Sequence, residues 1–316
     1  MPAKNDPPDL IKRVRRGEHA AASRALSLVV NEDAVADVLA KDFFKCSGVA
    51  QKLGVCGPPG AGKSTLLGRL IARYRAEKIK VGALMVDPSS SVSGGAFLGD
   101  RLRVMEHATD PGVFMRSLAS RGMIGGLTHA IFGAIHVLEA LGCRKILVET
   151  VGTGQDEVDI ASVVDTVLCV TTPAMGDEIQ AMKAGAMEIG DIFVVNKADL
   201  SGADRAVSAL RGALGLGRSA GQEPQAWGPP VVATSASSGE GVAELAEGVE
   251  AHWRYLKDSG EGRARLKKQH AAELRFWMQR RMIQAALDRV SDKNLEDLLA
   301  LRTDPASLGR KLMRSR

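Results

Sequence analysis

The stretch from Gly57 to Thr65, GPPGAGKST, restricts the possible folds of this chain more than any other segment. It fits the pattern G-x-x-x-x-G-K-[ST], whose glycines let the backbone wrap closely around a polyphosphate. Residues 52–56 before it are mostly apolar, as in a buried strand, and residues 63–77 have the apolar spacing of a helix. The order of strand, glycine-rich loop and helix predicts an α/β domain that binds phosphate groups at the positive end of that helix.

Two side chains of this segment have chemical roles beyond the shape of the loop. Lys63 is expected to place a positive charge near the β- and γ-phosphates, and Ser64 to offer its hydroxyl to Mg²⁺. Backbone N–H groups of the loop are expected to point at the phosphate oxygens. The predicted phosphate-binding residues are Gly57, Pro58, Pro59, Gly60, Ala61, Gly62, Lys63, Ser64 and Thr65.

Acidic side chains end two further segments that have the composition of buried strands. Residues 81–86 are followed by Asp87, and the segment 144–149 ends in Glu149. In open parallel sheets ligands lie at the carboxyl ends of the strands. We therefore expect Asp87 to face the γ-phosphate, its metal ion or the attacking water, and Glu149 to hold Mg²⁺ through water. Both are predicted to be catalytic together with Lys63.

The glycine-rich segment 93–101 carries one acid, Asp100. Such a segment suits a loop that becomes ordered on a triphosphate, and Asp100 is then a further metal-shell carboxylate; it reads equally well as a solvated loop acid. The predicted metal-binding residues are Ser64, Asp87, Asp100 and Glu149. No arginine is favoured for neutralising the charge that develops during phosphoryl transfer, and the candidates are Arg101, Arg116 and Arg121.

The sequence Asn196-Lys197-Ala198-Asp199 follows the strand-like residues 191–195 and looks like the guanine-reading motif N-K-x-D of GTPases. In that interpretation Asp199 accepts hydrogen bonds from guanine N1–H and the 2-amino group, Asn196 braces the loop, and the stem of Lys197 covers the ring. The last predicted strand, 231–237, ends in a Ser-Ala segment that turns a backbone N–H to guanine O6 in the GTPases it resembles. The predicted base-binding residues are Asn196, Lys197, Asp199, Ser235, Ala236 and Ser237.

Helical patterns flank this domain on both sides. We expect an N-terminal helical extension over 1–45, a P-loop GTPase domain over 46–257 and a C-terminal helical arm over 258–316. The arm carries an apolar stripe, which favours dimerisation over folding back on its own domain. Residues 261–316 hold 14 Lys/Arg and 7 Asp/Glu, against a net charge of +5 for the 316 residues. We interpret this excess as the solvated face of amphipathic helices and expect no nucleic-acid partner.

Composition excludes several other classes of protein. No window of 18 apolar residues exists, so no segment is expected to span a membrane, and the N-terminus lacks the apolar core of a signal peptide. We therefore expect the protein in the cytoplasm. The four cysteines form no close pairs in the sequence and are expected to be reduced. Six scattered histidines and no cysteine cluster argue against delivery of a metal ion.

Taken together, the segments GPPGAGKST, VDPSS, GAFLGDR, ETVGTGQ, NKAD and TSA resemble the MeaB/ArgK/MMAA family of P-loop GTPases over nearly the whole chain. The resemblance implies a mainly parallel sheet flanked by helices, GTP/GDP and Mg²⁺ as ligands, and a homodimer held by the C-terminal arm. It also implies a chaperone of an adenosylcobalamin-dependent acyl-CoA mutase, such as methylmalonyl-CoA mutase, in which GTP hydrolysis gates cofactor loading and protects or rescues the mutase. By the same resemblance the segment 174–183 is an extra switch, in which Lys183 links nucleotide state to partner contact.

Several points depart from the family pattern or stay open. Glu149 stands where many GTPases have Asp, and Thr153 stands where Ras-like proteins have the water-orienting Gln, so Gln155 is given no role. The alternatives are a nucleotide-switched binding module without significant hydrolysis, and a kinase linked to basic amino-acid transport, for which no acceptor-site motif is present. Which acyl-CoA mutase is served does not follow from the residues.

Overall fold

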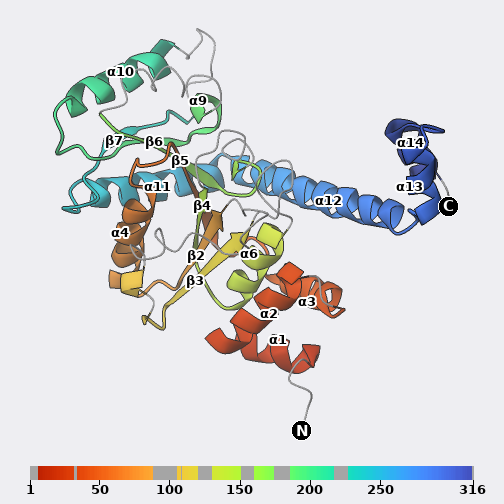
Figure 1. The fold of residues 1–316 in the computed structure, drawn as a ribbon. Helices are drawn as coiled ribbons and strands as arrows, with labels where there is room; N and C mark the ends of the chain where they lie inside the picture. The colour runs from red at the N-terminus through yellow and green to blue at the C-terminus, as the bar shows by residue number, and fades with distance from the viewer. Residues whose placement is uncertain are drawn as a thin grey trace. The chain divides into compact units, whose positions relative to one another are not determined.

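The computed structural model describes residues 6–31, 34–87, 105–107, 109–119, 130–150, 160–173, 186–216 and 227–314. Within these residues, seven parallel strands form one sheet in the order β3-β2-β4-β1-β5-β6-β7 (Figure 1). The strands are β1 (Gln51–Cys56), β2 (Val81–Asp87), β3 (Val113–Ala119), β4 (Lys145–Thr150), β5 (Thr166–Thr171), β6 (Ile192–Val195) and β7 (Val231–Ala233). The predicted α/β class with a parallel sheet is confirmed.

The chain divides into two compact units, Met1–Lys267 and Lys268–Arg316, and the first contains the whole sheet. The longer helices that begin in the first unit are α1 (Pro7–Arg15), α2 (His19–Asn31), α3 (Ala36–Phe43), α4 (Lys63–Ala76), α6 (Ala130–Ala140), α10 (Ala203–Leu216), α11 (Val242–Asp258) and α12 (Glu261–Leu287). Short helical turns are η1 (Phe44–Cys46), η2 (Met105–His107) and α9 (Ala186–Ile189). The second unit contains the rest of α12, then α13 (Asp292–Leu299) and α14 (Pro305–Arg314).

Helices cover both faces of the sheet because its central strands are apolar on both sides, as is usual for parallel sheets. On one face α4 packs beside α11, and on the other α6 packs against the N-terminal helices α2 and α3 (Figure 1). Leu66, Leu70 and Ile71 of α4 are fully buried in the core. Each such side chain stabilises the fold by about 1.5–3 kcal/mol through burial of its apolar surface. The phosphate-loop helix is therefore anchored firmly to the sheet.

Two glycines let helical segments approach the opposite face. A Cβ atom on Gly54 of β1 would lie 2.6 Å from Cδ1 of Ile160, and one on Gly82 of β2 would lie 2.7 Å from Cδ1 of Leu138 in α6. A Cβ atom at either position would force the neighbouring side chain to shift, so glycine permits this close packing. The sheet can thus carry a helical layer directly over the strands that end at the candidate site.

Strand β3 is not among the strands expected from the sequence. It lies at an edge of the sheet, with Val81 of β2 opposite Val113. Polar Arg116 and Ser117 interrupt its apolar run, so it lacks the continuous apolar pattern of the inner strands. Helix α14 lies within the helical arm expected over 258–316, and Pro305 at its first position is a common helix start.

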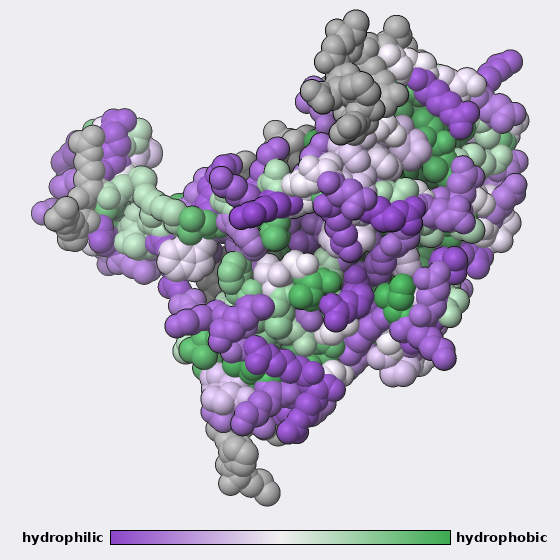
Figure 2. Space-filling view, turned by 180° about the vertical axis from the view of Figure 1, so that it is seen from behind, coloured by the Kyte–Doolittle hydropathy of each residue, from purple (hydrophilic) through white to green (hydrophobic). Residues whose placement is uncertain are grey.

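The cysteines are all free, as the sequence predicts. Cys56 and Cys169 lie opposite each other on β1 and β5, with their buried Sγ atoms 3.4 Å apart. Among the described residues, no helix is both long and apolar enough to cross a lipid bilayer. Hydrophilic residues cover most of the face shown in Figure 2, where apolar residues appear in small separate areas.

Candidate nucleotide site

The glycine-rich loop connects the carboxyl end of β1 to the first residue of α4, Lys63. The loop requires glycine at two positions. Gly57 has φ +136°, and a Cβ atom there would lie within 2.1 Å of the carbonyl oxygen of Val170. Gly62 has φ +86°, and its Cβ atom would lie 2.4 Å from Nδ2 of Asn196. The loop therefore sits tightly against β5 and the segment after β6, with the helix terminus directly behind it.

Lys63 folds back onto its own loop. Its buried ammonium group donates hydrogen bonds to the carbonyl oxygens of Gly57, at 2.7 Å, and Pro58, at 3.0 Å. Exchanging a neutral carbonyl oxygen for an anionic phosphate oxygen strengthens the attraction on this cation, because both partners are then charged. The ammonium group thus lies where a phosphate oxygen that enters the loop can replace the carbonyl oxygens as its hydrogen-bond acceptor.

Ser64, at the start of α4, contacts Glu149, near the end of β4. Val55 of β1 lies opposite Glu149 of β4, and the Ser64 hydroxyl donates a 2.6 Å hydrogen bond to Oε1 of Glu149. A hydroxyl and a carboxylate are the oxygen ligands that Mg²⁺ prefers, and Mg²⁺ usually combines one or two of them with water and phosphate oxygens. Within the part of the chain that the structure describes, no group of three or more His, Cys, Asp or Glu could hold a metal ion by itself. The pair therefore fits a magnesium ion that arrives with a nucleotide.

The other predicted metal and switch residues are placed only in part. Asp87 is the last residue of β2, which pairs with β4 up to Val86 and Thr150, so its backbone lies at the same sheet edge as Glu149. The side chain of Asp87 is outside the described residues. Arg116 lies on β3 and donates a hydrogen bond to Oγ of Ser27 at 3.1 Å, so it is engaged by α2. Outside the described residues lie Asp100, Arg101, Arg121, Thr153, Gln155 and the segment 174–183 with Lys183.

Asn196 connects the phosphate loop to the loop after β7. This side chain is almost fully buried and donates through Nδ2 to the carbonyl oxygen of Ala61 at 2.8 Å. Its Oδ1 accepts from the Thr234 hydroxyl at 3.2 Å and from the Ala236 amide at 3.1 Å. The bracing role predicted for Asn196 thus matches its contacts. The Ala236 amide already has an acceptor, so a contact with guanine O6 would have to share or replace that bond.

The remaining N-K-x-D residues lie at the surface beside the loop after β7. Lys197 is exposed with φ +58°, and Asp199 is exposed. A hydrogen bond from the Ser235 side chain lowers the pKa of Asp199, with smaller contributions from its own backbone amide and from the charge of Lys197. The Ser235 and Ser237 hydroxyls are 2.9 Å apart. Asp199 is therefore ionised at neutral pH, as an acceptor for two guanine donors requires.

One residue of this region has no sequence signal. Arg69 lies on the exposed side of α4 and donates to the carbonyl oxygens of Ala236, at 2.8 Å, and Ser237, at 2.6 Å. In the sequence it is an ordinary charged position of an amphipathic helix. Its two acceptors lie 167 and 168 residues away along the chain, so only the fold reveals the contact.

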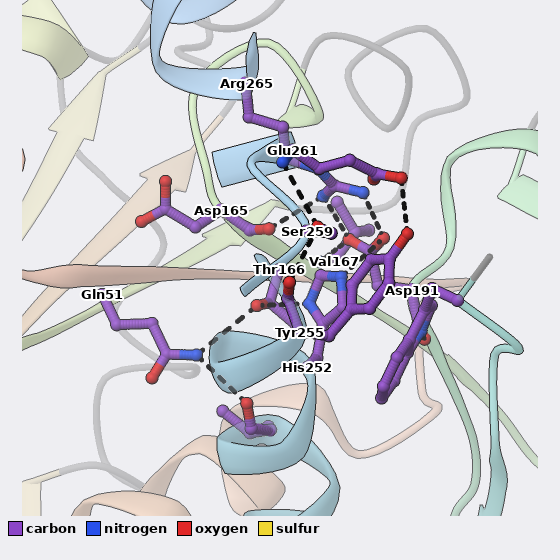
Figure 3. Close-up of polar contacts among 12 residues, drawn as sticks. Gln51, Asp165, Thr166, Val167, Asp191, His252, Tyr255, Ser259, Glu261 and Arg265 are labelled. Atoms are coloured by element: carbon purple, nitrogen blue, oxygen red, sulfur yellow. Dashed lines mark hydrogen bonds and ion pairs between the residues drawn. The ribbon is translucent and has the colours of Figure 1, made fainter. Parts of the chain in front are cut away.

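A second polar cluster lies at the opposite edge of the sheet, where β5 and β6 begin (Figure 3). Arg265 of α12 donates to both carboxylate oxygens of Asp191, at 2.6 and 2.7 Å, and to the carbonyl oxygen of Asp165. His252 of α11 lies between them, with Nδ1 2.9 Å from the Thr166 hydroxyl. Burial lowers the pKa of His252 from 6.5 to about 4, while Asp191 raises it and Arg265 lowers it. These groups hydrogen-bond to one another, and their contacts join α11 and the start of α12 to the sheet.

The comparisons with known proteins agree with this geometry. The family model described as methylmalonyl-CoA mutase-associated GTPase MeaB matches residues 22–291. A putative GTPase of Pyrococcus horikoshii is 49% identical over 253 residues, 80% of each chain. GTPase ArgK of Escherichia coli is 36% identical over 245 residues, 74% of this chain and 72% of the relative. The mitochondrial methylmalonic aciduria type A homolog of Mus musculus is 36% identical over 230 residues, 72% of this chain and 54% of the relative.

A solved structure agrees over the full length. The crystal structure of a protein titled LAO/AO transport system kinase matches with a TM-score of 0.73 and 25% identity, covering 99% of this chain and 98% of that one. The similarity therefore includes the parallel sheet and the helices that precede and follow it.

Proposed function

The chain belongs to the MeaB family of methylmalonyl-CoA mutase-associated GTPases, and from that membership we propose that it is a GTP-hydrolysing chaperone of an adenosylcobalamin-dependent acyl-CoA mutase. It gates the loading of adenosylcobalamin into this mutase and protects or reactivates it. Methylmalonyl-CoA mutase or a close relative is the proposed partner, because the family description names that mutase and the mouse relative is named after methylmalonic aciduria.

The observation that carries the nucleotide part of the proposal is the position of Asn196. Its side chain hydrogen-bonds both to Ala61 in the phosphate loop and to Ala236 in the loop after β7. Asn196 thereby fixes the distance between the phosphate loop and the loop after β7, the proposed sites for the phosphates and the base. The ionised Asp199 beside the second loop fits the N1–H and 2-amino donors of guanine, whereas adenine has no such pair of donors.

Phosphoryl transfer depends mostly on positioning and charge neutralisation. In the proposed mechanism the Lys63 ammonium leaves the carbonyl oxygens of Gly57 and Pro58 and binds the β- and γ-phosphate oxygens. The Ser64 hydroxyl and the Glu149 carboxylate would hold Mg²⁺, which supplies positive charge to the developing negative charge on the phosphates. Asp87, at the end of β2, is proposed to orient the attacking water, and Asp100 to complete the metal shell.

We propose that intrinsic turnover is slow. Of the three candidate arginines, Arg116 is the one that the structure describes, and its guanidinium group donates a hydrogen bond to Ser27 of α2. Proteins of this kind gain a factor of about 10³–10⁵ in kcat when an arginine reaches the transition state. We therefore propose that the mutase accelerates hydrolysis when it orders the segment 174–183, with Lys183 linking nucleotide state to partner contact.

Hydrolysis of GTP measured with and without the purified mutase tests this proposal. We expect slow release of phosphate from the chaperone alone and a clear increase with mutase, and no turnover with the Lys63→Ala variant in either case. An unchanged rate with every cobalamin-dependent acyl-CoA mutase of the source cell would refute the chaperone assignment. Turnover by Lys63→Ala would refute the role of the loop.

The guanine assignment is tested by the Asp199→Asn variant. Asparagine presents an amide donor to the 2-oxo group of xanthine but loses the acceptor for guanine, so GTP affinity should fall by about tenfold or more. Xanthosine triphosphate should bind as well as before or better. The control is Asp204→Asn in the first turn of α10, which removes an exposed carboxylate nearby in the sequence. Equal GTP binding by the wild type and Asp199→Asn would contradict the proposal.

We further propose that the protein is a homodimer. Within the unit Lys268–Arg316, large apolar side chains are exposed that a helical arm would bury against a second copy. These are Leu274, Trp277, Met278, Met282, Ile283, Leu287, Leu295, Leu299, Leu301 and Met313. Sedimentation of a variant with Met282→Glu and Ile283→Glu should then give a monomer from a dimeric wild type.

The name LAO/AO transport system kinase raises the alternative of a kinase for a protein or amino-acid acceptor. Transfer of radiolabel from the γ-phosphate of GTP to an acceptor, instead of release as phosphate, would favour that alternative. A nucleotide-switched binding module would show affinity for GTP and a partner without any turnover. The cytoplasmic location and the domain limits 1–45, 46–257 and 258–316 are kept as proposals.

A further inference from the structure

Arg69 contacts the loop that is proposed to read guanine, although it belongs to the phosphate-loop helix. It lies on the second turn of α4, which begins at Lys63. Its Nε atom donates to the carbonyl oxygen of Ala236 at 2.8 Å, and its Nη2 atom donates to that of Ser237 at 2.6 Å. The planar guanidinium group holds its two acceptors in one fixed relative orientation, which the rotatable ammonium group of a lysine does not impose.

These contacts determine the direction of a backbone donor. In a trans peptide the C=O and N–H groups of one plane point in opposite directions, and the described residues contain no cis peptide bond. Because the Ala236 carbonyl faces Arg69, the Ser237 N–H of the same peptide plane points away from α4. The Ala236 N–H is held by Asn196 at 3.1 Å. Ala236 is thus held through both its amide and its carbonyl group. The next backbone donor along the loop is the Ser237 N–H.

We propose that Arg69 is a positioning residue for base specificity, which aims the Ser237 N–H at the 6-oxo group of a bound purine. This inference rests on the proposed function, since it assumes that the loop after β7 lies at the base. The inference explains why the site would prefer a purine with a 6-oxo group. A side chain of the phosphate-loop helix sets the geometry of the loop that contacts the base. The Ser235 hydroxyl, two residues before Ser237, hydrogen-bonds to Asp199, so the same loop segment serves both edges of the base.

The test compares binding of GDP with that of 6-thioguanosine 5′-diphosphate by calorimetry in the presence of magnesium. This analogue keeps N1–H and the 2-amino group and replaces the 6-oxo oxygen with sulfur, a weak hydrogen-bond acceptor. In the wild type, GDP should bind about tenfold or more tightly than the analogue, as one oriented hydrogen bond permits. In Arg69→Ala this ratio should fall to about threefold or less, because a mobile amide gains less from the acceptor. Affinity for the analogue itself should change little, since Arg69 contacts no part of the phosphate loop in this proposal.

The matched control is Arg73→Ala, one turn further along α4. Arg73 pairs with Glu77 at 2.7 Å, and its removal deletes the same charge from the same helix. It should keep the wild-type ratio. Arg69→Lys, which keeps the charge but lacks the planar fork, should give an intermediate ratio. Both Arg69 variants should unfold at nearly the wild-type temperature.

The outcomes separate this inference from the proposed function. A wild-type protein that prefers GDP over ADP but shows the same ratio in Arg69→Ala overturns the role of Arg69 alone. So does an equal loss of affinity for GDP and for the analogue, which would indicate a general effect on the loop. A wild-type protein that binds ADP as well as GDP overturns both the guanine assignment and this inference.

Discussion

Acidification should destabilise the unit Met1–Lys267 through His252. Burial lowers the pKa of this imidazole from 6.5 to about 4; the carboxylate of Asp191 raises it, and the charge of Arg265 lowers it further. Between these two pH values the unfolded chain binds a proton that the folded chain does not bind. The free energy of unfolding therefore falls as the pH decreases from about 6.5 to about 4, and this residue has little effect above pH 7.

The size of the effect follows from the shift. A pKa difference of about 2.5 between the unfolded and folded states corresponds to a loss of about 2.5 kcal/mol between pH 7 and pH 4.5. Urea unfolding at a series of pH values measures it through the fluorescence of Trp227 and Trp253, the two tryptophans of this unit. The ring centroid of Trp227 lies 4.7 Å from that of His252. A Trp277→Phe background removes the tryptophan of the second unit from the signal.

The matched variant is His252→Gln, which keeps a hydrogen-bonding side chain near Thr166 but cannot titrate. Protonation of carboxylates destabilises both proteins in acid, so only the difference between them reports on His252. The wild type should lose about 2.5 kcal/mol more than His252→Gln over this range. Parallel pH profiles for the two proteins would show that His252 binds protons equally in both states and would refute the reasoning.

Three other variants probe the framework of the site and the cluster behind it. Arg265→Ala leaves the buried Asp191 carboxylate without its cation and should lower stability by about 3 kcal/mol. The exposed Arg263→Ala is the control and should change stability little. Arg265→Ala should also weaken the pH dependence of stability, because a charge that lowers the pKa of His252 is gone. Gly57→Ala places a Cβ atom within 2.1 Å of a backbone oxygen at φ +136°, so calorimetry should detect no GDP binding even if circular dichroism shows a folded chain. Asn196→Ala removes three hydrogen bonds and should lower stability by about 2 kcal/mol in thermal unfolding without nucleotide.

Features carried by contiguous residues could be predicted from the sequence. The phosphate loop and N-K-x-D each consist of neighbouring residues, and each follows an apolar run that forms a strand because it is buried on both faces. Parallel strands bring their carboxyl ends to one edge, so the approach of Glu149 to Ser64 followed from topology alone. The bracing by Asn196 was expected from the motif and agrees with its contacts.

Features that depend on pairs distant in sequence could not be predicted. Arg265 and Asp191 are 74 residues apart, and nothing in either local pattern distinguishes them from solvated surface charges. The same holds for Arg69 and its carbonyl acceptors. Strand β3 was not predicted for a different reason: Arg116 and Ser117 interrupt the continuous apolar run by which the inner strands were recognised.

The two polar edges of the sheet differ in a way that separates a ligand site from a structural cluster. At the carboxyl edge, Lys63 bonds to loop carbonyls and Ser64 to Glu149, and a phosphate or a metal ion can replace each contact with a stronger one. At the amino edge, a bidentate ion pair joins Arg265 to Asp191, and replacing either partner would strand a buried charge. A ligand can replace the contacts at the carboxyl edge but not the ion pair at the amino edge. Nucleotide should therefore bind where the strands end. The edge where they begin instead anchors the root of helix α12.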